Sequence, residues 1–386
     1  MIFNRQDIMK EKILSEFGAR FPQTPVLYAS AGRINLIGEH TDYNGGFVFP
    51  GAIDKVIMAA IAPNDSDHVN VFSIDINEEV SFGLREEDAP SQSWARYIFG
   101  VCREVQKRGG EVKGFNAVFA GNVPLGAGLS SSAALESCFA YALNDLYNEN
   151  RIDKFELARI GQSTEHNYCG VNCGIMDQFA SVMGEKGKLM RIDCRSMEFE
   201  YFPFAPKDYE LVLVDSRVKH ELADSPYNKR RQSCERVAAC LGIETLRDAD
   251  MEKLEAIRDE ISAEDYSRAK FVIEEKERVL AVCDALNRGD YETVGKKMYE
   301  THQGLSKDYE VSCEELDFLN DVAKECGVTG SRIMGGGFGG CTINLVRKDL
   351  TESFIATATE RFNARYGHKP QIYPVIISDG ARKLPQ

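Results

Sequence analysis

Residues 124–132 read PLGAGLSSS and run into a segment of helical periodicity, and this stretch decides the fold. Gly126 and Gly128 allow the backbone to approach a ligand closely, and three serines follow where the helix begins. The first N–H groups of a helix are unpaired and its dipole end is positive, so the pattern predicts a phosphate site. An ordinary serine-capped helix after a glycine turn has the same pattern. A Walker A loop is excluded, because the chain contains no GK[ST] sequence.

Segments with strand and helix patterns alternate on both sides of this loop. The second half of the chain has a different pattern, with a long, charge-rich helical block between predicted strands. We predict an α+β chain of two domains with a boundary near residues 195–208, where Pro203 and Pro206 interrupt the pattern. We expect the two domains to cover residues 1–200 and residues 201–386. Predicted strands are 26–37, 47–61, 68–74, 115–119, 209–214, 341–346 and 371–377, and predicted helices include 94–108, 153–168, 228–324 (as a block) and 350–366.

The composition excludes several classes of protein. The 386 residues are 43% hydrophobic and 27% charged, as in globular proteins, and the net charge of −14 disfavours nucleic acid and anionic membrane as partners. The eleven cysteines show no zinc spacing, so we expect reduced and mostly buried thiols. No apolar run reaches the length of about 18 residues that a membrane span needs, and the N-terminus lacks a signal-peptide core. We expect a soluble cytoplasmic protein.

A second polar stretch, GRINLIGEHTDYNGG, covers residues 32–46. Glu39 and Asp42 stand three residues apart after an apolar strand core, and carboxylates accept strong hydrogen bonds from hydroxyl groups. This spacing indicates a clamp for a polyol, with Arg33 as an anion ligand. A polar turn that closes a hairpin at Asn44-Gly45 is the alternative interpretation.

Two further segments carry candidate chemistry. Residues 335–340, GGGFGG, fit GxGxxG as a string, but a strand rather than a helix follows, which disfavours a dinucleotide site. The glycines serve either tight backbone packing or the approach of a ligand. Asp177, in CGIMDQFAS, is a lone acid among apolar residues and is either paired in the core or catalytic. Glu165, on the preceding predicted helix, is a metal-ligand candidate or an ordinary surface residue.

These segments, in this order, resemble the GHMP small-molecule kinase superfamily, and within it the galactokinase family. GRINLIGEHTDYNGG is similar to the galactokinase signature, PLGAGLSSSAALE to the phosphate loop of the superfamily, and GGGFGG to its third motif. The resemblance spans residue 26 to at least residue 345. It implies an N-terminal domain like ribosomal protein S5, a C-terminal ferredoxin-like α/β domain, and an active site in the cleft between them.

The resemblance also implies a role for each matching residue. Asp177 matches the catalytic aspartate, and Arg33 matches an arginine that stabilises the transferring phosphoryl group. The sugar ligands would be Glu39, His40, Thr41, Asp42, Gly174, Asp177 and Tyr227. The nucleotide would contact Gly126, Ala127, Gly128, Leu129, Ser130, Ser131, Ser132, Ser73 and Trp94, with Tyr97 in the stretch near the adenine. Ser132 and Glu165 would hold Mg²⁺.

The implied reaction is the transfer of the γ-phosphoryl group of ATP to the anomeric hydroxyl of α-D-galactose, giving galactose 1-phosphate and ADP. The partners are then galactose and MgATP, and we expect a monomer, although the sequence does not speak against an oligomer. A sugar kinase acting on N-acetylgalactosamine or arabinose is one alternative. A galactose- and ATP-binding regulator without turnover is another, although the intact Ser132-Ala133 pair and Asp177 favour an active enzyme.

Overall fold

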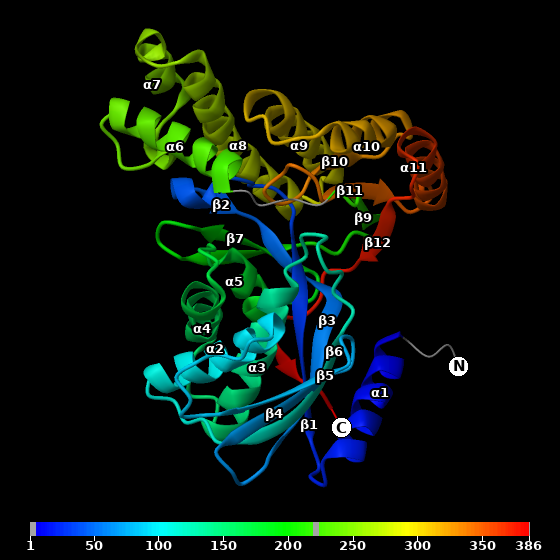
Figure 1. The fold of residues 1–386 in the computed structure, drawn as a ribbon. Helices are drawn as coiled ribbons and strands as arrows, with labels where there is room; N and C mark the ends of the chain where they lie inside the picture. Colours follow the sequence, from blue (N-terminus) through cyan, green and yellow to red (C-terminus); the bar gives the residue numbers. More distant parts are fainter. Residues whose placement is uncertain (1–4, 219–223, 386) are drawn as a thin grey trace.

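The computed structural model describes residues 5–218 and 224–385 and shows two lobes stacked on each other (Figure 1). The N-terminal lobe is built on a six-stranded sheet of order β13-β1-β3-β6-β4-β5, antiparallel except where β4 pairs with β6. Its strands are β1 (Val26–Asn35), β3 (Pro50–Pro63), β4 (His68–Ser73), β5 (Glu78–Gly83), β6 (Phe115–Gly121) and β13 (Arg382–Lys383).

Helices cover both faces of this sheet, which explains why β1 and β3 are buried along most of their length. Helix α1 (Arg5–Arg20) packs Ile13 and Phe17 against one face. The other face carries α2 (Ser93–Lys107), α3 (Ser131–Tyr147), α4 (Lys154–Thr164) and α5 (Met176–Met183) (Figure 1). The apolar period predicted after the phosphate loop is the buried face of α3.

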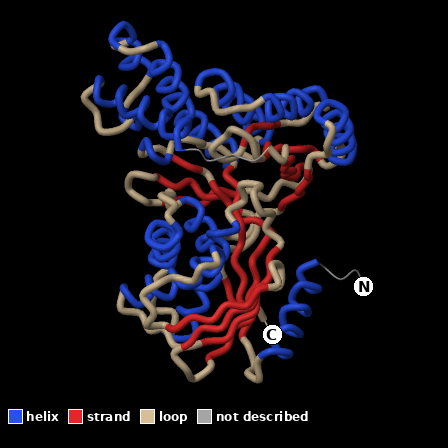
Figure 2. Tube along the Cα trace, viewed as in Figure 1, coloured by secondary structure: helices blue, strands red, loops and turns tan. Residues whose placement is uncertain are grey.

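The C-terminal lobe contains an antiparallel sheet of order β10-β11-β9-β12 and most of the remaining helices (Figure 2). One face of this sheet packs on α10 and α11. A smaller sheet, β2-β7-β8, belongs to the region between the lobes. The elements are β9 (Tyr209–Asp215), β10 (Gly330–Ile333), β11 (Cys341–Arg347), β12 (Gln371–Val375), β2 (Phe47–Val48), β7 (Lys188–Asp193), β8 (Phe199–Pro203), α6 (Asp224–Cys240), α7 (Met251–Ala256), α8 (Ala263–Asn287), α9 (Tyr291–Gln303), α10 (Glu314–Glu325) and α11 (Thr351–Tyr366).

Each strand and helix predicted from the sequence is present, and the α+β class is confirmed. The sequence pattern did not predict several short elements, namely β5, β7, β8, β10, β13 and α5. The predicted helix over residues 153–168 is α4 followed by a π-helical turn, Glu165–Cys169. The division at residue 200 stays a prediction. The end of the chain returns to the N-terminal lobe, because Ile377 bridges Ile53 and β13 pairs with β1.

Two further expectations concern cysteines and membranes. All eleven cysteines lie in the described part of the chain and each is a free thiol, but only five are buried, so the expectation of mostly buried thiols is wrong. Across residues 5–218 and 224–385, no helix has both the length and the apolar character needed to cross a bilayer.

Candidate active site

Arg33 and Asp177 form the centre of the site. Arg33 lies near the end of β1 and Asp177 in the first turn of α5, and the guanidinium holds the carboxylate through Nε–Oδ1 and Nη2–Oδ2 contacts of 2.7 Å each. Such a two-point contact fixes both groups in direction as well as distance. The Asp177 side chain is still 30% exposed, so a substrate can reach it. The lone acid of the sequence is therefore paired and accessible at once.

The phosphate loop, residues 124–132, is joined to this pair. The Arg33 guanidinium also donates to the Gly128 carbonyl, and the Ser130 hydroxyl donates to Asp177 Oδ2. The Ala127 and Leu129 side chains are buried in the core, whereas Gly126 and Gly128 are exposed in left-handed conformations with open space around them. The loop is thus anchored by its two apolar side chains and presents its glycines outward.

The start of α3 is open to an anion. Ser130 is the N-cap residue, at φ 57°, but its side chain does not cap the helix, because it bonds to Asp177 instead. The first N–H groups of α3 consequently lack a side-chain acceptor from the cap position, and the helix dipole adds positive potential there. Such a helix start suits an anion, and the phosphate site at Ser131 and Ser132 stays a prediction.

Glu165 and Ser132 lie together beside the loop. Glu165 begins the π-helical turn and is buried. Burial raises the pKa of Glu165, and the Ser132 hydroxyl lies near enough to its carboxylate to oppose that shift. No group of three or more His, Cys, Asp or Glu side chains in the described residues could hold a metal by itself. Two oxygen donors next to a phosphate site suit Mg²⁺, which takes most of its remaining ligands from phosphate and water.

Asp42 lies in a cavity next to the centre of the site. Gly174 lies directly against it, since a Cβ on this glycine would sit 3.2 Å from Asp42 Oδ2. The cavity has a volume of about 330 Å³, and its walls include Tyr43, Cys173 and Met176. Burial raises the pKa of Asp42 from its usual value to about 6, and the charges of Glu39 and Asp177 add to the shift. Three predicted site carboxylates therefore lie close enough to influence one another.

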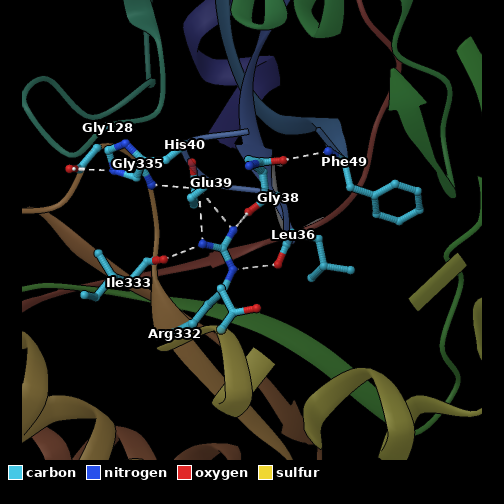
Figure 3. A network of polar contacts seen from close by, with 12 residues as sticks. Leu36, Gly38, Glu39, His40, Phe49, Gly128, Arg332, Ile333 and Gly335 are labelled. Atoms are coloured by element: carbon cyan, nitrogen blue, oxygen red, sulfur yellow. Dashed lines mark hydrogen bonds and ion pairs between the residues drawn. The ribbon is translucent and has the colours of Figure 1, made fainter. Parts of the chain in front are cut away.

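Glu39 is held from the other lobe (Figure 3). Its Oε1 accepts hydrogen bonds from both terminal nitrogens of Arg332, at 3.1 Å each, and from the Gly335 backbone N–H at 2.9 Å. Arg332 stands at the end of β10, immediately before the glycines of residues 335–340. The carboxylate predicted to clamp a sugar is thus fixed through one of its two oxygens.

His40 and Thr41 direct their polar atoms at protein groups. His40 Nε2 lies 3.1 Å from the Gly336 carbonyl oxygen and Nδ1 lies 2.9 Å from the Tyr43 hydroxyl. Burial lowers the pKa of His40 to about 4, so the ring is neutral near pH 7, and Nε2 must carry the proton that it donates to Gly336. The Thr41 hydroxyl lies 2.6 Å from the Phe47 carbonyl oxygen. Both residues shape the segment that carries Glu39 and Asp42.

The third glycine segment, residues 335–340, serves both purposes that its sequence suggested. At Gly337 a Cβ would lie 2.2 Å from the Val311 carbonyl oxygen, and at Gly339 it would lie 2.6 Å from that of Val218, so these positions are packed. Gly335 has open space around its Cβ position and gives its N–H to Glu39. Strand β11 follows this segment, as predicted.

The residues expected near the adenine lie on β4 and α2. Ser73 ends β4, and its buried hydroxyl has no hydrogen-bond partner among the described residues. The Trp94 indole N–H donates to Glu78 at 2.8 Å, and its ring packs 5.5 Å from that of Phe119. Tyr97 is half-buried, and its pKa is raised mainly by burial.

Tyr227 belongs to the first turn of α6, but its side chain lies outside the described part of the structure. Its predicted role stays a prediction.

Two residues that contact the site were missed by the sequence analysis. One is Arg332. The other is Glu275 of α8, whose Oε1 accepts the Gly38 backbone N–H at 2.8 Å. Both are fully buried charged residues, and each sits in an unremarkable helix or strand pattern. The position of Arg332 just before GGGFGG was the only local signal.

Known families match most of these segments. A model described as GHMP kinases N terminal domain matches residues 96–185, and one described as GHMP kinases C terminal matches residues 283–364. Between them they contain the phosphate loop, Asp177 and the third glycine segment. The fold and the site therefore define a GHMP kinase, and the prediction of a two-domain GHMP fold is confirmed.

The family within this class is also shown. The galactokinase galactose-binding signature matches residues 15–63. A galactokinase of Thermosipho africanus is 40% identical over 92% of this chain and 98% of that relative. One of Homo sapiens is 41% identical over 96% of this chain and 94% of the relative. Lactococcus lactis galactokinase, solved in complex with galactose, superposes with a TM-score of 0.90, at 32% identity over 98% of this chain and 100% of that chain. The chain belongs to the galactokinase family and is an enzyme of that family.

Proposed function

We propose that the chain transfers the γ-phosphoryl group of ATP to the anomeric hydroxyl of α-D-galactose, giving galactose 1-phosphate and ADP. The observation that carries this proposal is the Arg33–Asp177 pair, which joins an open phosphate loop to the segment with Glu39 and Asp42. Donor and acceptor sites thus meet at one accessible carboxylate. The Lactococcus lactis relative, whose structure holds galactose, supports the choice of sugar.

The nucleotide end is assigned to the phosphate loop. Its outward glycines and the first N–H groups of α3 would hold the phosphates, and Ser73 and Trp94 would lie towards the adenine. Ser132 and Glu165 would hold Mg²⁺, which neutralises charge on the β- and γ-phosphate oxygens when bound. The Ser132 hydroxyl lies near enough to the Glu165 carboxylate to oppose the rise of its pKa, so the two oxygen donors are neighbours.

Phosphoryl transfer has a loose transition state, so positioning and charge stabilisation carry most of the catalysis. Asp177 would orient the sugar hydroxyl and accept its proton. Arg33 would face the charge that develops on the transferring group, and its contact with the Gly128 carbonyl keeps it at the phosphate loop. Because Arg33 also pairs with the carboxylate, Asp177 contributes orientation and charge as well as accepting the proton.

Sugar recognition is assigned to Glu39, Asp42, Gly174 and the Tyr227 side chain. His40 and Thr41, which were predicted as ligands, are proposed to shape this segment, since their polar atoms contact Gly336, Tyr43 and Phe47. Buried carboxylates that bond particular hydroxyls reject analogues that leave those groups unpaired, by as much as about 10⁴. We therefore expect glucose, the 4-epimer, to be a poor substrate.

The test is ADP release with MgATP and a panel of galactose, glucose, N-acetylgalactosamine, arabinose and no sugar. Strong turnover on galactose alone is the expected result. Turnover on another member of the panel would keep the phosphate loop assignment and overturn that of Glu39 and Asp42. If galactose raises Tm without turnover, the chain is a regulator and the proposed reaction is wrong.

We also propose that the enzyme works in the cytoplasm. Its eleven free thiols support this, because such a set persists in a reducing compartment.

A further inference from the structure

We propose that Arg332 is a positioning residue for sugar recognition, which holds one carboxylate oxygen of Glu39 so that the other oxygen faces the substrate. This inference rests on the proposed function, because it concerns how the same site selects its sugar. Arg332 lies on the C-terminal lobe, 293 positions from Glu39 in the sequence.

The surroundings of Arg332 use every donor of its side chain. The residue is 0% exposed. Its Nε donates to the Leu36 carbonyl oxygen at 2.7 Å, and its two terminal nitrogens donate to the Asn35 and Ile333 carbonyl oxygens as well as to Glu39 (Figure 3). A guanidinium has five N–H groups in a rigid fork, and all five are engaged here. The group therefore has a single orientation.

Arg332 orients the Glu39 carboxylate through hydrogen bonds to one of its two oxygens. Oε1 accepts from Arg332 and from the Gly335 N–H, whereas Oε2 accepts no hydrogen bond from the described residues. The Glu39 side chain is only 6% exposed, so it has little room to rotate. Oε2 is left as the acceptor for a sugar hydroxyl.

A purely structural role makes a different prediction. If Arg332 only joins the lobes, its replacement lowers stability and leaves the KM for galactose unchanged in the protein that remains folded. If Arg332 orients Glu39, the KM for galactose rises and the KM for MgATP does not, because the contacts of Arg332 lie on the sugar side.

The first experiment is Arg332→Lys. Lysine keeps the charge but lacks the planar fork, so it cannot serve the backbone carbonyls and the carboxylate together. We expect the KM for galactose to rise about tenfold or more, the size of one lost charge-assisted hydrogen bond. The KM for MgATP should stay within about twofold. The control is Arg268→Lys, another buried arginine, which binds Ser233 and Glu264 on the helical side of the C-terminal lobe. It should lower Tm without changing either KM.

A second variant disturbs the other donor to Glu39 Oε1, the Gly335 backbone N–H, and leaves Arg332 unchanged. Gly335→Ala places a Cβ in open space but strains a backbone at φ +86°, which moves the N–H that Glu39 accepts. Gly367→Ala is the matched control, with φ +75° and open space at the end of α11. We expect only Gly335→Ala to raise the KM for galactose, about threefold.

The outcomes separate this inference from the proposed function. If the unmodified enzyme does not turn over galactose, the proposed function fails. If it does, and Arg332→Lys lowers Tm with an unchanged KM for galactose, the inference is overturned and the function stands. If Arg332→Lys does not fold, Gly335→Ala decides, and an unchanged KM for galactose overturns the inference.

Discussion

The phosphate loop and the sugar segment, residues 32–46, meet at Asp177 but are built in opposite ways. The loop takes its shape from its own sequence, with buried Ala127 and Leu129 alternating with exposed glycines. The core of the sugar segment is held by Glu275, Arg332, Gly335 and Gly336, which lie 237 to 297 positions later. A loop of the first kind can be recognised from a short string. A segment of the second kind depends on the assembled lobes.

The largest expected effect is at the junction of the two regions. Asp177→Asn removes the negative charge that pairs with Arg33. It also removes the carboxylate that would accept the proton of the sugar hydroxyl. We expect kcat to fall by about 10²–10⁴, the range of general-base catalysis, with smaller changes in either KM. A fall of only about tenfold would show that Asp177 is not an essential base. Initial rates at saturating galactose and MgATP measure this.

Two glycine variants should show that the phosphate loop has open space around its glycines, whereas the segment of residues 335–340 is tightly packed. Gly337→Ala, at φ +84° with its Cβ 2.2 Å from the Val311 carbonyl oxygen, should lower the free energy of unfolding by about 2–3 kcal/mol. Gly128→Ala, at φ +73° in open space, should cost about 1–2 kcal/mol at most.

The Gly128→Ala and Gly337→Ala variants should also differ in which substrate's KM changes. Gly128→Ala should raise the KM for MgATP several-fold, because this glycine faces the proposed phosphates. Gly337→Ala should act on galactose if it acts on either KM. Urea unfolding and steady-state kinetics on both variants test the contrast, and equal destabilisation by the two substitutions would contradict it.

The pH dependence should also distinguish the two regions. The pKa of Asp42 is about 6, so its carboxyl becomes protonated and stops accepting a charge-assisted bond as the pH falls through 6. We expect the KM for galactose to rise about tenfold between pH 7 and pH 5. The raised pKa means that the folded state binds more protons than the unfolded state between about pH 4 and pH 6, so this group lowers stability as the pH rises through that window.

Two comparisons assign this effect to Asp42. His40 cannot cause it, because its pKa of about 4 keeps the ring neutral throughout the range. Asp42→Asn should weaken galactose binding and flatten the pH profile of the KM for galactose. A profile that stays unchanged in this variant would place the titrating group elsewhere.

The smallest expected effect is at a contact from the C-terminal lobe to the phosphate loop. The buried Cys341 thiol, at the start of β11, donates to the Ala127 carbonyl oxygen at 3.1 Å. Cys341→Ala leaves that carbonyl without this donor and should cost about 1 kcal/mol more than Cys341→Ser, which can still donate. Thermal unfolding compares the two. Equal Tm values would show that the phosphate loop does not depend on this contact.

Much of the site could be predicted from short strings. The turn at Gly126 and Gly128, the start of α3 and the strand after GGGFGG depend on local backbone preference, and each is present. The pairing of Arg33 with Asp177 across 144 positions was not predicted from the sequence, because no local pattern relates residues so far apart. The short strand β8 was missed because Pro203, which ends it, indicated an interruption rather than a strand.

The sequence by itself determined the α+β class, the glycine turn before α3 and which carboxylates are candidates for the site, because backbone conformation and residue chemistry are local properties. Only the tertiary structure decided how those carboxylates are used. Arg332 fixes one oxygen of Glu39, Gly336 engages His40, and burial near two other charges brings the pKa of Asp42 to about 6. Burial and hydrogen-bond direction depend on residues hundreds of positions apart, so no local pattern contains them.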